Sequence, residues 1–252
     1  MINQTYRFSA DLFRTVYRFA SKEKGRYYLH GVCVQQAPKG QPGVVLVATD
    51  GHKLIVGYDP KGQAPEGQGV ILQTEGNKMP GAAFNDTRKG DRVVFLDAGD
   101  QNGGMSIGRI MQHPSGKEDF TEFVSAHAFA VLDGNFPDWH RIVPKFAGNK
   151  PADSASTFNA KYVKDFAAAA QDFGGRKNAV ISIWATDAAS PAIVTFGTVE
   201  PGGRDLFGVL MPVRSNSGAD TGAPDWTHSF DVPAIATEET VTLEAEPLKV
   251  AA

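Results

Sequence analysis

The chain has 252 residues, enough for one large domain or two ordinary ones, and its 42% hydrophobic and 21% charged residues are typical of a globular protein. Its single cysteine, Cys33, excludes an internal disulfide and favours a reducing compartment, so we expect a cytoplasmic protein. No run of about 18 apolar residues is present and the N-terminus lacks the pattern of a secretory signal, so we expect no association with a membrane.

Charge is distributed unevenly along the chain. The formal net charge is −3, but residues 1–62 carry +5 and residues 215–252 carry −6. A basic N-terminal third and an acidic tail suggest one surface that attracts an anion and another that repels it. Ordinary solvated charge explains the same numbers equally well.

The hydrophobic pattern predicts many strands and few helices, which is the α+β class. Ser9–Ser21 is the first predicted helix, with Ser9 as its N-cap and an apolar stripe at spacings of three and four residues. A short strand, Tyr6–Phe8, precedes this helix. The strands predicted after it are Tyr27–Gln35, Val44–Thr49 and, beyond an Asp50-Gly51 turn, Lys53–Tyr58.

This order of strand, helix and three strands recurs twice more by pattern. The second copy comprises the strand Gly69–Gln73, a weak helix Asn77–Asn85 and the strands Arg92–Leu96, Met105–Met111 and Phe120–Val131. The third comprises Thr157–Asn159, the helix Ala160–Phe173 and the strands Ala179–Trp184, Ala192–Thr198 and Asp205–Val213. Composition predicts linkers at Lys145–Ala155 and Ser215–Asp225, and either an edge strand at Thr240–Ala245 or a disordered tail.

The sequence contains no recognisable reaction centre. The six histidines lack metal-binding spacing, and neither a phosphate-binding loop nor a nucleophile elbow is present. Cys33 lies in a strand-like segment, where a buried small side chain is the expected role. Turn chemistry explains the proximity of Asp50 and His52 better than acid–base catalysis does. We therefore expect no enzyme, no metal and no cofactor.

Basic residues near the N-terminus have a pattern typical of contact with a nucleic-acid backbone. Arg14, Arg18 and Lys22 recur on one predicted helical face, and a short basic loop follows them. Tyrosine beside such cations can stack on a base or pack on a sugar, and of the pair in this loop we expect Tyr28 to point inward. The alternative is a solvated helix face with core tyrosines. The loop residues of this candidate site are Lys24, Arg26 and Tyr27.

Four blocks of sequence together resemble the bacterial DNA polymerase III β sliding clamp. They are RYYLHGV at Arg26–Val32, VATDGHKLIV at Val47–Val56, LDGNFPDWHRIVPK at Leu132–Lys145 and VLMPVR at Val209–Arg214. The resemblance assigns residues 1–138 to a domain like the middle clamp domain and 139–214 to a partial C-terminal domain, followed by an acidic tail, 215–252. It implies a DNA-clamp fold of repeated β-α-β-β-β units, with helices toward DNA and sheets outside.

The resemblance implies a DNA sliding clamp, a non-catalytic processivity factor in DNA replication. Such a protein forms a homo-oligomeric ring, surrounds duplex DNA without sequence specificity, and tethers DNA polymerase, the clamp loader and other proteins through their clamp-binding peptides. The alternative is a clamp-like adaptor or decoy that binds those peptides without encircling DNA. Three units per chain leave one unit unpaired. Either a diverged fourth unit within 145–252 permits a trimeric ring, or the chain does not close a ring.

The resemblance also implies a largely apolar peptide-binding cleft between the two domains. The first domain supplies Leu29, Thr49, Gly51, His52, Lys53 and Leu54, the joint supplies Pro137, Arg141 and Ile142, and the C-terminal strand supplies Val209, Met211, Pro212, Val213 and Arg214. A simple domain core is the alternative for these apolar residues. Lys161 and Lys164 join the candidate DNA-binding set on the basis of their charge and spacing alone.

Overall fold

A computed structural model describes residues 5–67, 69–74, 91–97, 102–111, 120–144, 156–174, 179–185, 187, 189–197 and 203–213. Contacts divide the chain into two units, 1–216 and 217–252, and all the described residues lie in the first. The predicted helix Asn77–Asn85, both predicted linkers and the acidic tail lie outside the described residues. The domain boundary at residue 138 stays a prediction.

The first repeat follows the predicted order, with two local differences, one of which is that its helix ends at Tyr17 and not at the predicted Ser21. Ser9 caps its helix as expected, because the Ser9 hydroxyl accepts a hydrogen bond from the Leu12 N–H at 3.3 Å. The predicted strand at Tyr27–Gln35 is wrong in its first part, since residues 27–29 form a 3₁₀ turn closed by the His30 N–H donating to the Tyr27 carbonyl at 3.0 Å. The elements are β1 (Thr5–Ser9), α1 (Ala10–Tyr17), η1 (Tyr27–Leu29), β2 (Val32–Gln36), β3 (Val44–Thr49) and β4 (Lys53–Asp59).

The second repeat and the first exchange their leading strands. Its described elements are β5 (Val70–Thr74), β6 (Asp91–Asp97), β7 (Asn102–Met111) and β8 (Phe120–Leu132). β1 of the first repeat pairs with β6 of the second, and β5 of the second pairs with β2 of the first, in both cases antiparallel. The two repeats are therefore interlocked, each completing the sheet of the other.

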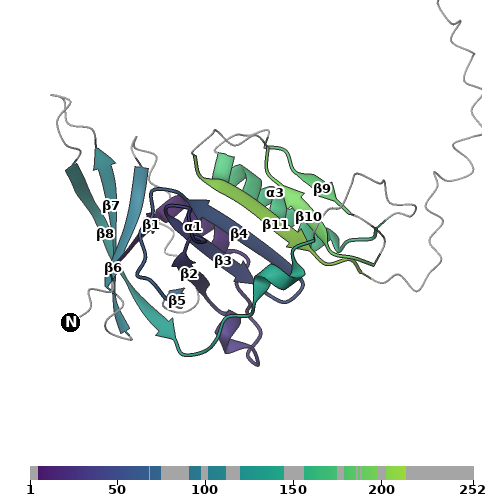
Figure 1. The fold of residues 1–252 in the computed structure, drawn as a ribbon, viewed down its shortest axis with the longest axis horizontal. Helices are drawn as coiled ribbons and strands as arrows, with labels where there is room; N and C mark the ends of the chain where they lie inside the picture. Colours follow the sequence, from purple (N-terminus) through teal and green to yellow (C-terminus); the bar gives the residue numbers. More distant parts are fainter. Residues whose placement is uncertain are drawn as a thin grey trace, which may run out of the picture. The chain divides into compact units, whose positions relative to one another are not determined.

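The third repeat extends the sheet of the first. It consists of α3 (Ala160–Gly174), β9 (Ser182–Trp184), β10 (Ala192–Thr195) and β11 (Asp205–Leu210), with η3 (Trp139–Ile142) in the joint that leads to it. β11 pairs antiparallel with β4, so that Val209 faces Leu54. The described strands form one antiparallel sheet in the order β1-β6-β7-β8-β5-β2-β3-β4-β11-β10-β9, shown in Figure 1.

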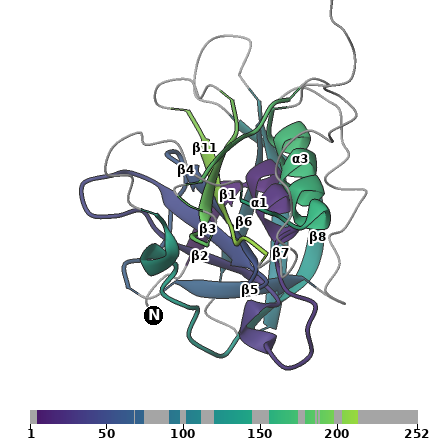
Figure 2. The same cartoon turned by 90° about the vertical axis from the view of Figure 1, so that its right-hand side faces the viewer.

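Helices α1 and α3 lie side by side over this extended sheet (Figure 2). Each helix approaches its strand at a glycine. A Cβ atom at Gly57 of β4 would lie 2.7 Å from Leu12 of α1, and one at Gly208 of β11 would lie 2.2 Å from Phe166 of α3. Phe166 and Phe19 are fully buried with ring centroids 4.8 Å apart, so a single core joins the first and third repeats.

Candidate functional site

A cavity of about 260 Å³ opens where β4, β11 and the joint segment meet. Its floor is apolar, with Leu54 from β4, Val209 from β11 and Ile142 from η3. The Met211 N–H donates to the His52 carbonyl at 3.0 Å, which ties the end of β11 to the turn before β4. Three segments far apart in the sequence therefore form one hollow. Its lining residues are Arg26, Tyr28, Leu29, Thr49, Gly51, His52, Lys53, Leu54, Pro137, Asp138, Trp139, Ile142, Val209 and Met211.

The structure brings most of the predicted cleft residues into this lining, and a few lie elsewhere. Pro212 and Val213 follow β11 without lining the cavity, and the Val213 N–H donates to the Thr157 carbonyl at 2.7 Å. Arg141 faces a neighbouring hollow that includes Ser190. Arg214 lies outside the described residues.

The geometry of η3 explains why Arg141 departs from its neighbours. In a 3₁₀ helix, residues three apart lie on the same face, so Trp139 and Ile142 both point into the cavity while Arg141 does not. Trp139 packs against Phe207 of β11, with ring centroids 6.3 Å apart. Its indole Nε1 is buried without a hydrogen-bond partner among the described residues. This leaves a buried donor in the wall of a cavity whose floor is apolar.

The turn before β4 is fixed by the Asp50 carboxylate. Its Oδ1 accepts hydrogen bonds from the His52 and Lys53 N–H groups at 3.0 Å each, and Gly51 has a φ of 90°, which favours glycine. Asp50 and His52 therefore lie close together because Asp50 caps the backbone of the turn, as the sequence predicted. Burial alone would raise the pKa of Asp50, but the hydrogen bonds from Lys53 and His52 outweigh it and hold that pKa below its usual value.

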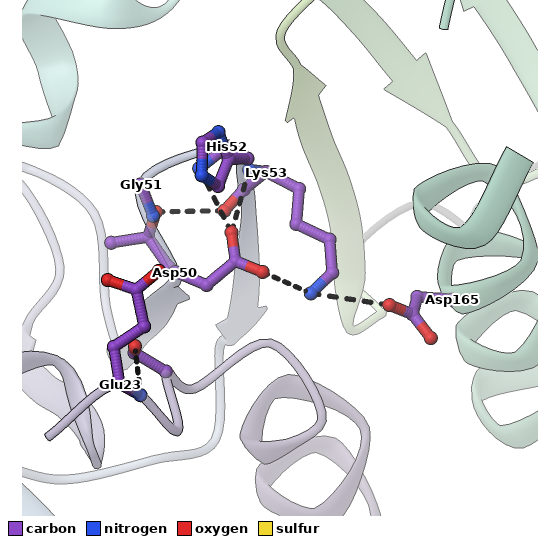
Figure 3. A network of polar contacts seen from close by, with 8 residues as sticks. Glu23, Asp50, Gly51, His52, Lys53 and Asp165 are labelled. Atoms are coloured by element: carbon purple, nitrogen blue, oxygen red, sulfur yellow. Dashed lines mark hydrogen bonds and ion pairs between the residues drawn. The ribbon is translucent and has the colours of Figure 1, made fainter. Parts of the chain in front are cut away.

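Lys53 connects the cavity to the third repeat. Its side chain is 6% exposed, and its Nζ lies 2.7 Å from Asp50 Oδ2 and 3.3 Å from Asp165 Oδ2 on α3, as Figure 3 shows. The ammonium also lies 5.0 Å from the ring centroid of Phe19 and 5.5 Å from that of Tyr162. Lys53 thus lines the cavity, while its ammonium forms ion pairs that link the first repeat to the third.

Arg26 was predicted to contact DNA, yet it lines the cavity beside Tyr28. Its side chain is 47% exposed and its Nε lies 3.6 Å from Glu23 Oε2. The neighbouring Tyr27 is 55% exposed, and Tyr28 is less exposed, as expected. Arg26 therefore stands at the boundary between the basic loop and the cavity.

The other predicted DNA-binding cations divide into two groups. Arg14 of α1 and Arg18, which follows its last residue, both reach Asp172 of α3, with N–O distances of 3.6 Å and 2.5 Å. These arginines stabilise the contact between the two helices, and Asp172 offsets part of their charge. The remaining lysines, Lys22, Lys24, Lys161 and Lys164, are exposed.

Two further expectations concern chemistry and membranes. Cys33 is buried, and burial raises the pKa of its thiol to about 12, so it is an inert core side chain as predicted. No group of three or more potential metal ligands occurs within the described part of the chain. In that same part, no helix is long and apolar enough to span a membrane.

Comparison with known proteins supports the resemblance that the sequence motifs predicted. No family model matches the chain. Two curated β sliding clamps, from two strains of Caulobacter vibrioides, are each 32% identical over 130 residues, covering 51% of this chain and 30% of the relative. Solved structures of similar fold include the DNA polymerase III β subunit of Pseudomonas aeruginosa, with a TM-score of 0.53, 18% identity and coverage of 83% of this chain and 66% of that one. The Bacillus subtilis sliding clamp has a TM-score of 0.52, 17% identity and coverage of 85% and 65%.

These matches extend over only part of each relative. The matched segment spans less than a third of the curated relatives' length, and the fold match spans about two thirds of the solved chains. The structural likeness covers more than four fifths of the chain, whereas the sequence likeness covers half of it. The chain is therefore similar in sequence to bacterial β sliding clamps over that half, and it has the α+β clamp fold.

Proposed function

We propose that the protein is a clamp-type scaffold that binds short peptides of replication proteins in the cavity between β4 and β11. The observation that carries this proposal is the cavity itself. It is apolar, its walls come from the first repeat, the joint and the last strand, and it lies where the clamp-like motifs converge. In this role the chain tethers partners and catalyses no reaction.

The chemistry of the cavity fits a short peptide with aliphatic or aromatic anchors. Small apolar hollows with a few polar groups at the rim bind such anchors well. Met211 adds a flexible side chain that accommodates different partners. Arg26 and His52 stand at the rim, where they can bind polar groups of the peptide.

A peptide titration tests this site. The probe is a fluorescein-labelled peptide with adjacent leucine and phenylalanine anchors, and fluorescence anisotropy gives its dissociation constant. Met211→Ala is expected to raise that constant at least about 30-fold, since truncating a central anchor contact costs about 2 kcal/mol or more. Phe123→Ala, at an exposed position on β8 away from the cavity, is the matched control. Equal affinities for wild type and Met211→Ala would refute the site.

The proposal extends to DNA. As a sliding clamp, the protein encircles duplex DNA as a ring and is retained on closed circular DNA but slides off a linear fragment. The exposed Lys22, Lys24, Lys161 and Lys164 supply the cations that neutralise phosphates in this reading.

A second candidate function, a peptide-binding adaptor that does not encircle DNA, is favoured by one observation. Asp172 engages Arg14 and Arg18, two of the cations expected to face the duplex. Loading on a nicked circular plasmid, followed by gel filtration before and after linearisation, distinguishes the two functions. Retention that is lost on linearisation supports the clamp. Peptide binding without retention supports the adaptor.

A further inference from the structure

The third repeat lacks the exchange that completes the first two. β6 takes β1 as its outer neighbour and β2 takes β5, so in each case the first strand of one repeat covers the edge of the other. β9 holds the corresponding place in the third repeat, because it is the first of the three strands after the helix. Among the described residues, β9 pairs with β10 alone and ends the sheet.

The leading segment of the third repeat is also paired on one side only. In every repeat this segment lies beside the exit of its own last strand: Arg7 of β1 bridges Gln63, β5 pairs with β8, and Thr157 accepts a hydrogen bond from Val213. In the first two repeats the opposite side of the segment pairs with the other repeat. For residues 157–159, no described strand occupies that opposite side.

Residues 157–159 already resemble the end of β1 in sequence. Phe158, Asn159 and Ala160 match Phe8, Ser9 and Ala10, and Asn159 caps α3 through a hydrogen bond from the Lys161 N–H at 2.9 Å, as Ser9 caps α1. Phe158 points toward the core while Thr157 and Asn159 are exposed, the alternation of a strand with one buried face.

The edge of β9 is apolar and exposed, unlike its counterparts. All three residues of β9 are exposed, with Ile183 at 36% and Trp184 at 55%, and the adjoining Val180 is 66% exposed. In β2, by contrast, Val32 and Val34 are fully buried. An uncovered apolar edge strand is a template for another strand, and native proteins rarely leave one open.

We propose that two copies of this chain pair through their third repeats. Residues 157–159 of each copy add antiparallel to β9 of the other, as β1 adds to β6 and β5 adds to β2 within one chain. Because each copy offers one leading segment and one open edge, the contact is self-complementary and closes with two-fold symmetry. The two third repeats then form a complete domain whose halves come from different chains. Ile183, which pairs with the buried Val194, faces its core, and Trp184 lies on the opposite face of the sheet beside the added strand. This pairing rests on the repeats alone, so it stands or falls independently of peptide binding.

Light scattering after gel filtration of the full chain gives the first test. We expect twice the chain mass of 27.0 kDa, or a multiple of that pair, at micromolar concentration. Trp184→Asp places a charge at the centre of the contact and is expected to raise the dimer dissociation constant at least about 30-fold, the effect of losing an aromatic anchor. Phe123→Asp introduces the same charge at an exposed aromatic position on β8 and is expected to leave the dimer intact.

Cross-linking tests the register of the contact. Chains with Thr157→Cys are mixed with chains with Ser182→Cys and treated with a short bismaleimide. The native Cys33 is buried and unreactive. A covalent dimer is expected from the mixture, and far less from either variant alone. A wild-type chain that is monomeric at every concentration would overturn the proposal. So would a dimer that survives Trp184→Asp with unchanged affinity, or a dimer that gives no 157–182 cross-link. Circular dichroism confirms that each variant is folded.

Discussion

Replacing Lys53 by methionine tests how the first and third repeats are joined. The substitution keeps the buried stem and removes the ammonium, which bridges Asp50 and Asp165 and lies over Phe19 and Tyr162. Both carboxylates then lose a cation. Since methionine is close to lysine in length and is apolar, the change reports the charge rather than a cavity.

The expected loss of stability is about 2 kcal/mol. Breaking a fully buried ion pair by removing one partner costs about 3–5 kcal/mol, and breaking an exposed pair costs about 0–1 kcal/mol. Here the Lys53 side chain is 6% exposed, while the side chains of Asp50 and Asp165 are 20% and 35% exposed. Asp50 also keeps its hydrogen bonds from two backbone N–H groups. The cost therefore falls between the two limits, which corresponds to a melting temperature lower by about 4–8 °C for a chain of this size.

The substitution also changes the dependence of stability on pH. The pKa of Asp50 is lower in the folded protein than in the unfolded chain, where it is about 3.9. Its contribution to stability is therefore fully present above the unfolded pKa and is lost as pH falls through the folded pKa. Without the Lys53 ammonium the two values approach each other. The acid decline of stability should become shallower in Lys53→Met than in wild type.

Urea unfolding followed by circular dichroism at pH 7 and at several values between pH 3 and 5 measures both effects. Lys61→Met is the control, because Lys61 is exposed and the substitution is the same. A loss below about 0.5 kcal/mol at pH 7, or an acid decline identical to that of wild type, would refute the reasoning.

Two further substitutions separate the roles of the basic residues. Arg26→Ala should weaken binding of the anchor peptide about 3- to 10-fold, because Arg26 lines the rim of the cavity. Anisotropy titration measures this affinity. If the substitution weakened DNA binding alone, Arg26 would belong to the DNA-contacting residues, as the sequence predicted. Asp172→Asn should strengthen DNA binding and steepen its salt dependence by about 1–2 in log–log slope, since the Asp172 carboxylate then no longer offsets the charges of Arg14 and Arg18. Filter binding at several salt concentrations measures that slope, and an unchanged slope would show that these arginines only join the helices.

Local patterns predicted most strands and helices, because apolar residues recur at the spacing that turns them toward the core of each repeat. Val44–Thr49 is a strand with the predicted bounds, and Ala160 begins α3 as expected. Two predictions were wrong in part: α1 ends at Tyr17 and not at Ser21, and Tyr27–Leu29 is not a strand. Tyrosine favours strands on average, but two local hydrogen bonds and the burial of Leu29 close this segment into a turn.

The cavity-lining residues were predictable where they lie in recognisable motifs. They were less predictable where the direction of a side chain decides whether it lines the cavity. Arg141 belongs to the joint motif, yet the 3₁₀ geometry turns it away and brings Trp139 in. The three-residue spacing of Trp139 and Ile142 was the signal that could have found Trp139. Leu54 was predicted correctly as a lining residue, but it is 1% exposed, and its truncation would cost about 2–5 kcal/mol of folding stability. Leu54 lines the cavity but belongs chiefly to the core.

The pairing of β4 with β11 sets the order in which the protein can fold during synthesis. β4 ends at Asp59, and its partner begins at Asp205. At about 5–20 residues per second, the ribosome needs on the order of ten seconds to make the chain between them. Throughout that interval the nascent first repeat holds an open strand edge beside Leu54 and Val56, two side chains destined for the interior. Chains released before residue 205 would retain that edge permanently and would be substrates for chaperones or for aggregation.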